Sequence, residues 1–392
     1  MTTRYLLGTL GGGSAYDAIR PEDNDTDEHA AYAERIAERT MVLLKNDGVL
    51  PLDLRKLQSV AVIGPNADSV ACLEGNYNGI SSRFVTFLAG IRAACKDRAR
   101  VFYAKGSHLF KDRMQGLSGY AGDGVAEAVA AAKMADVSIL CLGLDATLEG
   151  EEGDTGNEYS SGDKTTLELP PCQQRLLDAV VAVGKPVVVL LASGSALAVT
   201  QGNAILQTWY PGQAGGTAAA RLLFGEASPS GRLPVTFYRD VAELPPFEDY
   251  AMANRTYRYF TGTPLYPFGY GLSYTRFTYA DARYEDGAVV VSVRNDGDYA
   301  ADEVAQVYIR PQDDAFAPLH PSLCAMSRLH LLPGEEASLR LPIPERAFTT
   351  VDDAGVRAKR AAAFTLYVGG NQPDARTAEL TGTKAIEITV RG

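Results

Sequence analysis

Apolar residues recur at helical spacing in the first patterned stretch of the chain. The stretch begins near His29, and its segment AAYAERIAERTMVLLKN places Ala, Ile, Met and Leu at i, i+3 and i+4 positions. It ends at Asp47–Gly48, a pair typical of a helix C-terminus. The pattern therefore predicts one helix that continues to this pair. Residues 1–25, which precede it, are Gly-rich at Gly11–Gly13 and then acidic, and they are predicted to form a tail.

Runs of consecutive apolar residues follow, and helical patterns separate them. Runs of this kind are typical of parallel strands buried on both faces, and they are SVAVI (59–63), VFYAKG (101–106), VSILCLGL (137–144) and PVVVLLASG (186–194). The helical patterns cover residues 124–135, 173–183 and 216–225. This alternation predicts an α/β sandwich, in which helices cover both faces of a parallel sheet. Ligands of such folds bind at the carboxyl ends of the strands, here in the loops after Leu144, Ser193 and Trp209.

The pattern changes near Pro234. Residues 241–274 are rich in Gly, Pro and Tyr and are predicted to form an ordered connector that lies across another surface. Beyond residue 275, apolar and polar residues alternate with a period of two, and turn signals such as Asp286–Gly287 recur. Short alternating strands with frequent turns predict an all-β sandwich at the end of the chain.

Composition excludes several classes of partner. The chain has 37 Lys and Arg against 48 Asp and Glu, a net charge of −11, which would repel nucleic acids and anionic membranes. No apolar run reaches the length of a membrane span. The N-terminus has no signal-peptide pattern, so the sequence predicts a cytoplasmic protein. The five cysteines are dispersed, which predicts buried reduced thiols, and the four histidines lack metal-ligand spacing, so no metal or cofactor is expected.

The loop after the strand VSILCLGL has an unusual concentration of carboxylates. Glu149, Glu151 and Glu152 lie between glycines, and further acidic residues follow. Crowded carboxylates at the end of a parallel strand can raise one pKa toward neutrality, as a general acid requires. The alternatives are a solvated acidic loop and a divalent-metal loop, although the spacing does not match the calcium-loop pattern.

A second polar loop, GNYNGISSR, covers residues 75–83. Asn76, Tyr77, Asn78 and Ser82 offer hydrogen-bond donors, acceptors and an aromatic face, which suit a sugar. The alternative is an ordinary turn-rich loop. The only tryptophan, Trp209, could stack on a sugar or pack in the core, and Ser193 lacks the GxSxG pattern of a hydrolase nucleophile, so a core or turn role is expected for it.

Seven segments taken together resemble glycoside hydrolase family 3. In chain order they are TMVLLKNDGVLPL, VAVIGPNAD, GNYNG, the Glu-rich loop ending in GDKTTLELP, WYPGQAGG, LLFGEASPSGRLPVTF and YPFGYGLSYTRF. GNYNG resembles the β-xylosidase and related β-glucosidase branch. The resemblance implies an α/β sandwich domain at 30–240, the connector at 241–274 and a fibronectin type III-like domain at 275–392. Residues 1–29 resemble the end and linker of the TIM-barrel domain that precedes them in the family.

The resemblance also implies a division of catalytic roles. Family members are retaining enzymes, in which a barrel aspartate attacks the sugar and a glutamate of the sandwich domain is the acid/base. In family loops of the form E-x-E-x-x-D-R, Glu149 matches the first glutamate and Glu151 the second, which usually is the acid/base. The extra residues DTGNEYSS and Lys164 in place of Arg leave the choice of glutamate open, so Glu152 and Glu149 are further candidates for the catalytic acid/base.

Three interpretations follow, because the barrel is not part of this sequence. The Met1 start near the expected barrel boundary favours a subunit of a split enzyme that acts on β-xylosides or β-glucosides with a separate TIM-barrel chain. The second interpretation is a fragment that is inert alone. The third is a non-catalytic carbohydrate-binding or scaffold module.

Overall fold

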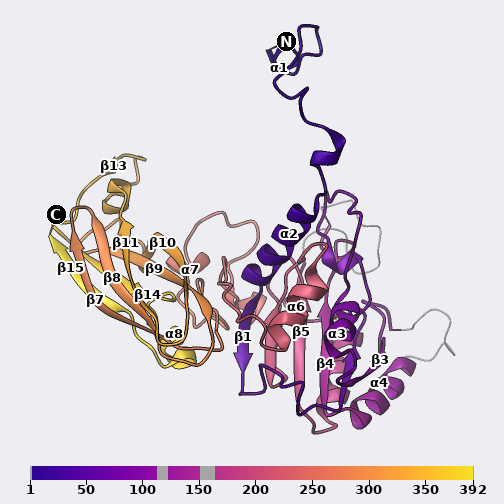
Figure 1. The fold of residues 1–392 in the computed structure, drawn as a ribbon. Helices are drawn as coiled ribbons and strands as arrows, with labels where there is room; N and C mark the ends of the chain where they lie inside the picture. The colour runs from indigo at the N-terminus through magenta and orange to yellow at the C-terminus, as the bar shows by residue number, and fades with distance from the viewer. Residues whose placement is uncertain (1, 113–121, 151–163, 392) are drawn as a thin grey trace.

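The computed structural model describes residues 2–112, 122–150 and 164–391, which form two domains joined by a connector (Figure 1). The N-terminal segment carries a short helix, α1 (Thr2–Leu6), and none of its side chains from residue 2 to residue 25 is buried. This tail extends away from the body of the molecule (Figure 1). No helix in the described residues is long and apolar enough to cross a membrane.

The first domain is built on a six-stranded sheet with the order β1-β6-β5-β4-β2-β3. All neighbouring strands are parallel except β1, which pairs antiparallel with β6 at one edge. The strands are β1 (Val42–Asn46), β2 (Ser59–Ile63), β3 (Arg100–Ala104), β4 (Val137–Gly143), β5 (Val187–Ala192) and β6 (Ala204–Gln207). The apolar runs predicted as parallel strands are therefore confirmed.

Helices cover both faces of this sheet, because alternate strand residues face opposite cores. Val60 and Val62 join one hydrophobic cluster, whereas Ala61 and Ile63 join the other. The first cluster includes side chains of α2 (Asp27–Thr40), α3 (Phe87–Cys95) and α6 (Gly215–Leu223). The second includes side chains of α4 (Asp123–Met134) and α5 (Pro171–Val181). The predicted α/β sandwich is confirmed.

One prediction about this domain is wrong. The helix expected to continue to Asp47–Gly48 ends at Thr40, and the residues after Met41 form strand β1. Val42, Leu43 and Leu44 are all buried, which a strand between two layers allows and a half-exposed helix does not. The strand also satisfies its backbone through pairing with β6.

Helices α3 and α6 cross so closely that glycine is required at the contact. A Cβ atom on Gly90 would overlap the backbone carbonyl oxygen of Gly216, and one on Gly216 would overlap that of Thr86. We expect Gly90→Ala to lower the free energy of unfolding by about 3 kcal/mol, because overpacking outweighs the gain of about 1 kcal/mol in helix propensity. Urea denaturation measures the loss. Ala93→Ser, on the exposed side of α3, is the control, and equal stability of both variants would contradict the prediction.

The connector runs from the first domain to the second, and it also contacts the edge of the six-stranded sheet. Leu272 forms a β-bridge with Leu43 of β1, and its N–H donates to the Leu43 carbonyl at 2.9 Å. The Tyr270 hydroxyl donates to the carbonyl of Leu44 at 3.0 Å. A short helix, α7 (Thr256–Tyr259), lies within the connector. Edge strand β1 is thus paired on both sides.

The second domain is an antiparallel β-sandwich. One sheet has the order β10-β9-β14-β15 and the other the order β11-β8-β7, with a hydrophobic cluster between them. A small β-hairpin and helix α8 complete it. The elements are β7 (Phe277–Glu285), β8 (Ala288–Asn295), β9 (Ala301–Pro311), β10 (Ser322–Leu331), β11 (Glu336–Pro342), β12 (Thr350–Val351), β13 (Arg357–Ala358), β14 (Ala363–Gly369), α8 (Ala375–Thr381) and β15 (Ile386–Arg391). This architecture confirms the predicted all-β sandwich.

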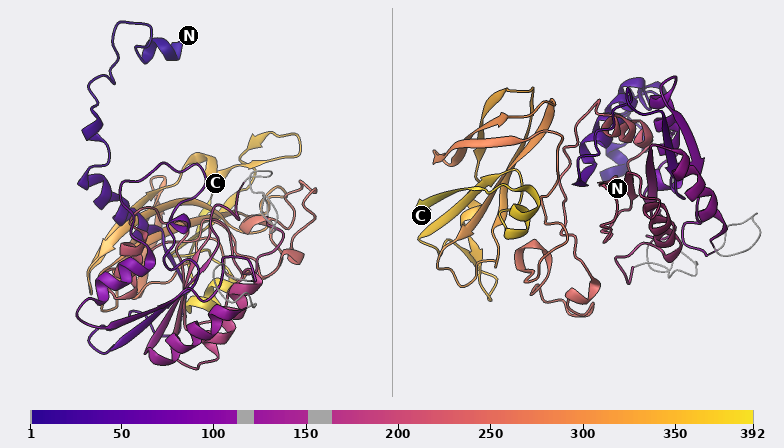
Figure 2. Two further views of the ribbon diagram at one scale, coloured as in Figure 1. Left: turned by 90° about the vertical axis from the view of Figure 1, so that its right-hand side faces the viewer. Right: turned by 90° about the horizontal axis from the view of Figure 1, so that it is seen from below.

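A buried ion pair joins the two domains, which lie side by side with the connector between them (Figure 2). Arg232, in the segment after α6, donates to Glu303 of β9 at 2.8 Å, and the two side chains are only 9% and 3% exposed. The Tyr279 hydroxyl donates to the other Glu303 oxygen at 2.8 Å, and the Arg232 Nε donates to the Gly370 carbonyl at 3.1 Å. Both charges therefore have partners on both sides of the interface.

Candidate active site

The described end of the acidic loop lies at the carboxyl edge of the parallel sheet. After β4, residues 145–149 form a turn, in which the N–H groups of Leu148 and Glu149 donate to the Asp145 carbonyl at 3.0 and 3.1 Å. Asp145 itself accepts from the Thr147 N–H at 2.9 Å. Leu148 is buried in the core and fixes the turn to the sheet. As a result, Glu149 lies next to the ends of β5 and β6.

The Glu149 carboxylate accepts hydrogen bonds from two other segments and pairs with a cation from a third. The Gly194 N–H donates at 2.7 Å and the Ser195 N–H at 3.1 Å, both just after β5. The hydroxyls of Ser195 and of Tyr210, which follows β6, donate as well. The Lys164 ammonium lies 3.9 Å from the carboxylate. The Glu149 and Lys164 side chains are only 11% and 15% exposed, so the group is largely shielded from water.

Burial and charge act on the titratable partners of Glu149. Burial, together with the adjacent Glu149 carboxylate, raises the pKa of Tyr210 far above its ordinary value, so that its hydroxyl stays protonated and donates. Burial lowers the pKa of Lys164, and the Glu149 charge opposes that effect. Lys164 also donates to the Ala196 carbonyl at 2.9 Å. The group thus holds one carboxylate among four hydrogen-bond donors and one ammonium group.

The local backbone explains how these donors reach Glu149. Ser193 is buried; its hydroxyl donates to the Ser195 carbonyl at 2.8 Å and accepts from the Gln207 amide at 3.0 Å. The turn role expected for Ser193 is confirmed. Trp209 has a left-handed backbone, with φ of 58°, directly before Tyr210. Its indole N–H donates to the Thr40 carbonyl at 3.0 Å and its ring packs edge-on against Phe237, which favours packing over sugar stacking.

The loop 75–83 lies beside the described start of the acidic loop. The Asn76 amide donates to the Glu149 carbonyl at 3.1 Å, so two sequence-predicted site residues meet. Asn78 donates to the neighbouring Gly79 carbonyl at 3.1 Å, while Tyr77 and Ser82 are exposed. The exposed position of Tyr77 leaves its ring accessible from outside the domain.

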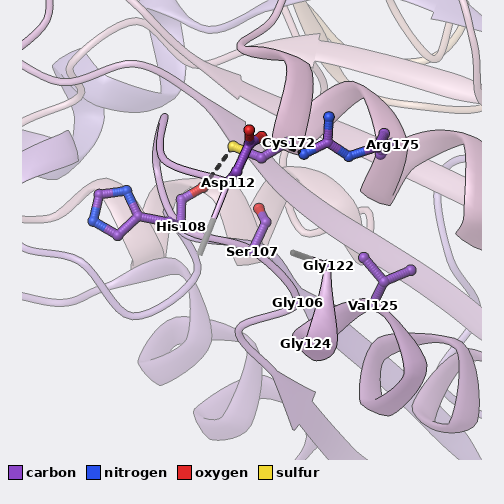
Figure 3. Close-up of a pocket in the computed structure, with 9 residues that line it drawn as sticks. All are labelled: Gly106, Ser107, His108, Asp112, Gly122, Gly124, Val125, Cys172 and Arg175. Atoms are coloured by element: carbon purple, nitrogen blue, oxygen red, sulfur yellow. Dashed lines mark hydrogen bonds and ion pairs between the residues drawn. The ribbon is translucent and has the colours of Figure 1, made fainter. Parts of the chain in front are cut away.

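A small cavity lies beyond the end of β3 (Figure 3). Its volume is about 10 Å³, close to the space that one water molecule needs, so it cannot hold a sugar ring. Arg175 pairs with Asp112 at 2.6 Å, and the Cys172 thiol donates to the His108 carbonyl at 3.2 Å (Figure 3). Elsewhere in the described residues, no group of three or more His, Cys, Asp or Glu could hold a metal ion.

The same arrangement of motifs occurs in known proteins. Residues 41–274 match the model of the glycosyl hydrolase family 3 C-terminal domain. This match covers more than half of the chain. The chain belongs to glycoside hydrolase family 3. Residues 303–372 match the fibronectin type III-like domain. The family predicted from the sequence is therefore confirmed, together with both of its fold classes.

Relatives of this chain include β-xylosidases and β-glucosidases. A β-xylosidase of Formosa agariphila is 30% identical over 97% of this chain, and a periplasmic β-glucosidase of Salmonella typhimurium is 33% identical over 88% of it. Among solved structures, the family 3 β-glucosidase of Bifidobacterium adolescentis is 31% identical, with a TM-score of 0.79 over 95% of this chain. The chain covers 54%, 49% and 55% of these proteins, which is about half of their length.

The family 3 sequence pattern identified only part of this site. Glu151 and Glu152 lie outside the described residues, so their predicted catalytic role stays a prediction. The donors around Glu149, namely Gly194, Ser195 and Tyr210, were not among the predicted site residues. The only signal for them was their position after strands of the same sheet edge.

Proposed function

We propose that this chain supplies the acid/base half of a retaining β-glycosidase whose nucleophile lies on a separate TIM-barrel chain. Glu151 is the proposed acid/base, and Glu152 is the alternative. The observation that carries the proposal is the fixed position of Glu149, two residues before Glu151, at the carboxyl edge of the sheet. Loops at this edge are where α/β sheets bind their ligands.

Retaining chemistry requires a second carboxylate about 5–5.5 Å from the first, on the other side of the glycosidic bond. The relatives are about twice as long as this chain, and the family pattern assigns that carboxylate to a barrel domain, outside the half of the relatives that this chain matches. The names of the relatives support β-xylosides or β-glucosides as substrates. Glu151 would then protonate the leaving oxygen and later activate the water that releases the sugar.

Exposed apolar side chains support a protein partner on the same side of the molecule. The loop 75–83 exposes Tyr77 and Ile80, and the Ile80 side chain is fully exposed. The tail exposes six large apolar residues, namely Tyr5, Leu6, Leu7, Leu10, Tyr16 and Ile19. Apolar surface of this kind marks interaction sites in soluble proteins. A barrel domain that packs on the loops and the tail would cover it.

The proposal is tested by mixing this chain with a barrel protein of the same source and assaying nitrophenyl β-xyloside and β-glucoside. We expect activity only in the mixture, and co-elution of both chains on a sizing column. Activity of the chain alone would contradict the division of the site between two chains. Co-elution without activity would favour a scaffold module. The absence of both activity and co-elution would favour an inert fragment.

A further inference from the structure

The two described ends of the acidic loop meet at one buried group of side chains. Glu149 and Lys164, which flank residues 150–163, lie 3.9 Å apart. Glu149 accepts hydrogen bonds from Gly194 and Ser195 in the segment after β5. Lys164 donates a hydrogen bond to Ala196 in the same segment. A single short segment after β5 therefore holds both ends of the loop.

The hydrogen bonds around Glu149 define what this residue can do. Each of its oxygens accepts from one backbone N–H, and a backbone N–H cannot turn to become an acceptor. The hydroxyls of Ser195 and Tyr210 donate to the same two oxygens. With donors on both oxygens from the segments after β5 and β6, the Glu149 carboxylate is held in place by its neighbours in the protein. A proton donor to a glycosidic oxygen must instead direct a carboxyl oxygen at the substrate.

We propose that Glu149 is a positioning residue, which ties the acidic loop to the ends of β5 and β6 and so sets the place of the acid/base. This inference rests on the proposed function, since it assigns the acid/base to the loop and not to Glu149. Lys164 is the second contact of this kind. It connects the far end of the loop to Glu149 and to the segment after β5, and these residues together are called the anchor. Asn76 connects the neighbouring loop 75–83 to the Glu149 carbonyl, so the anchor holds both loops together.

The first test concerns the anchor alone and uses the isolated chain. Glu149→Gln keeps the shape of the side chain but turns one oxygen into an NH₂ group that faces N–H and O–H donors. We expect faster hydrogen exchange at the Gly194 and Ser195 amides. The control is Asp136→Asn, a carboxylate that accepts from Gln58 and Ser59 N–H groups at the amino ends of the strands. If hydrogen exchange at the Gly194 and Ser195 amides were unchanged in Glu149→Gln, Glu149 would not hold this segment in place and the inference would be overturned.

The second test measures catalysis by the chain mixed with its barrel partner. For Glu149→Gln we expect kcat for a β-disaccharide to fall by about tenfold to 100-fold, as for a misplaced catalytic group, with little change in KM. The loss with nitrophenyl glycosides should be much smaller, because good leaving groups need little protonation. Lys164→Met should show the same pattern more weakly, since the four neutral donors to Glu149 remain.

The pH profile separates positioning from direct acid catalysis. If Glu149 positions the acid, kcat of Glu149→Gln still decreases at alkaline pH as it does in the wild type, but from a lower maximum. Loss of that limb would make Glu149 the acid and overturn the inference, as would equal losses on both substrate classes. A wild-type mixture without activity would instead reject the proposed function. The exchange measurement on the isolated chain would still decide whether the anchor exists.

Discussion

Replacing Glu151 by alanine is expected to lower the activity of the assembled enzyme on alkyl β-glycosides and disaccharides by roughly 10²–10⁴-fold, the usual contribution of a general acid. Leaving groups of this kind are poor, so their departure depends on protonation in the transition state. Nitrophenol leaves as a stable anion, and hydrolysis of its glycosides should suffer much less in that step. The measurement is kcat/KM for both substrate classes, with the same barrel partner.

Glu152→Ala is the matched control, because it removes a carboxylate one position away. We expect it to lower both activities only slightly and in equal proportion. The assignment would be wrong if Glu152→Ala alone showed the dependence on the leaving group, or if Glu151→Ala impaired both substrate classes equally. The resemblance to the family leaves Glu149, Glu151 and Glu152 as candidates, and this pair of variants distinguishes the last two.

Removing one partner of the buried ion pair between the domains should have the largest effect on stability. Glu303→Ala leaves the Arg232 guanidinium buried at the interface without a carboxylate, and it removes the acceptor of the Tyr279 hydroxyl. We expect the free energy of unfolding to fall by about 3–5 kcal/mol, the typical cost of an unpaired buried charge. Urea denaturation followed by circular dichroism measures this change.

Two further variants show whether the charge is responsible. Replacing both residues, as in Arg232→Met with Glu303→Leu, should restore much of the lost stability, since no charge is then left unpaired. Glu285→Ala removes an exposed pair with Arg283 and should change stability little. A loss for Glu303→Ala no larger than that for Glu285→Ala would refute the role given to the interface pair.

Strands β2, β4 and β5 could be predicted because full burial on both faces produces runs of consecutive apolar residues. The same rule explains the error at β1, where Val42–Leu44 follow a helix without a break and fit the end of its apolar pattern. Helix α3 was not predicted at all. Gly90 interrupts its helical pattern, and the reason for that glycine is the contact with α6, which no local pattern reveals.

The candidate site was predictable in its place but not in its partners. The rule that ligands bind at the carboxyl ends of parallel strands indicated the loops after β4, β5 and β6, and the structure brings residues of these three loops together around Glu149. It could not show that Tyr210 and Ser195 donate to Glu149, because those contacts depend on how separate loops turn in space. The left-handed backbone of Trp209, which precedes Tyr210, is a local conformation that the residue type does not predict.

The bridge between Leu43 and Leu272 has a consequence for dissecting this chain. Strand β1 is at the end of the sheet, and residues of the connector occupy its outer hydrogen-bonding side. A fragment cut at residue 240 would present that side to solvent as a free template for pairing with other copies. Solubility of the first domain therefore depends on residues 241–274, and a soluble fragment should end beyond Tyr274.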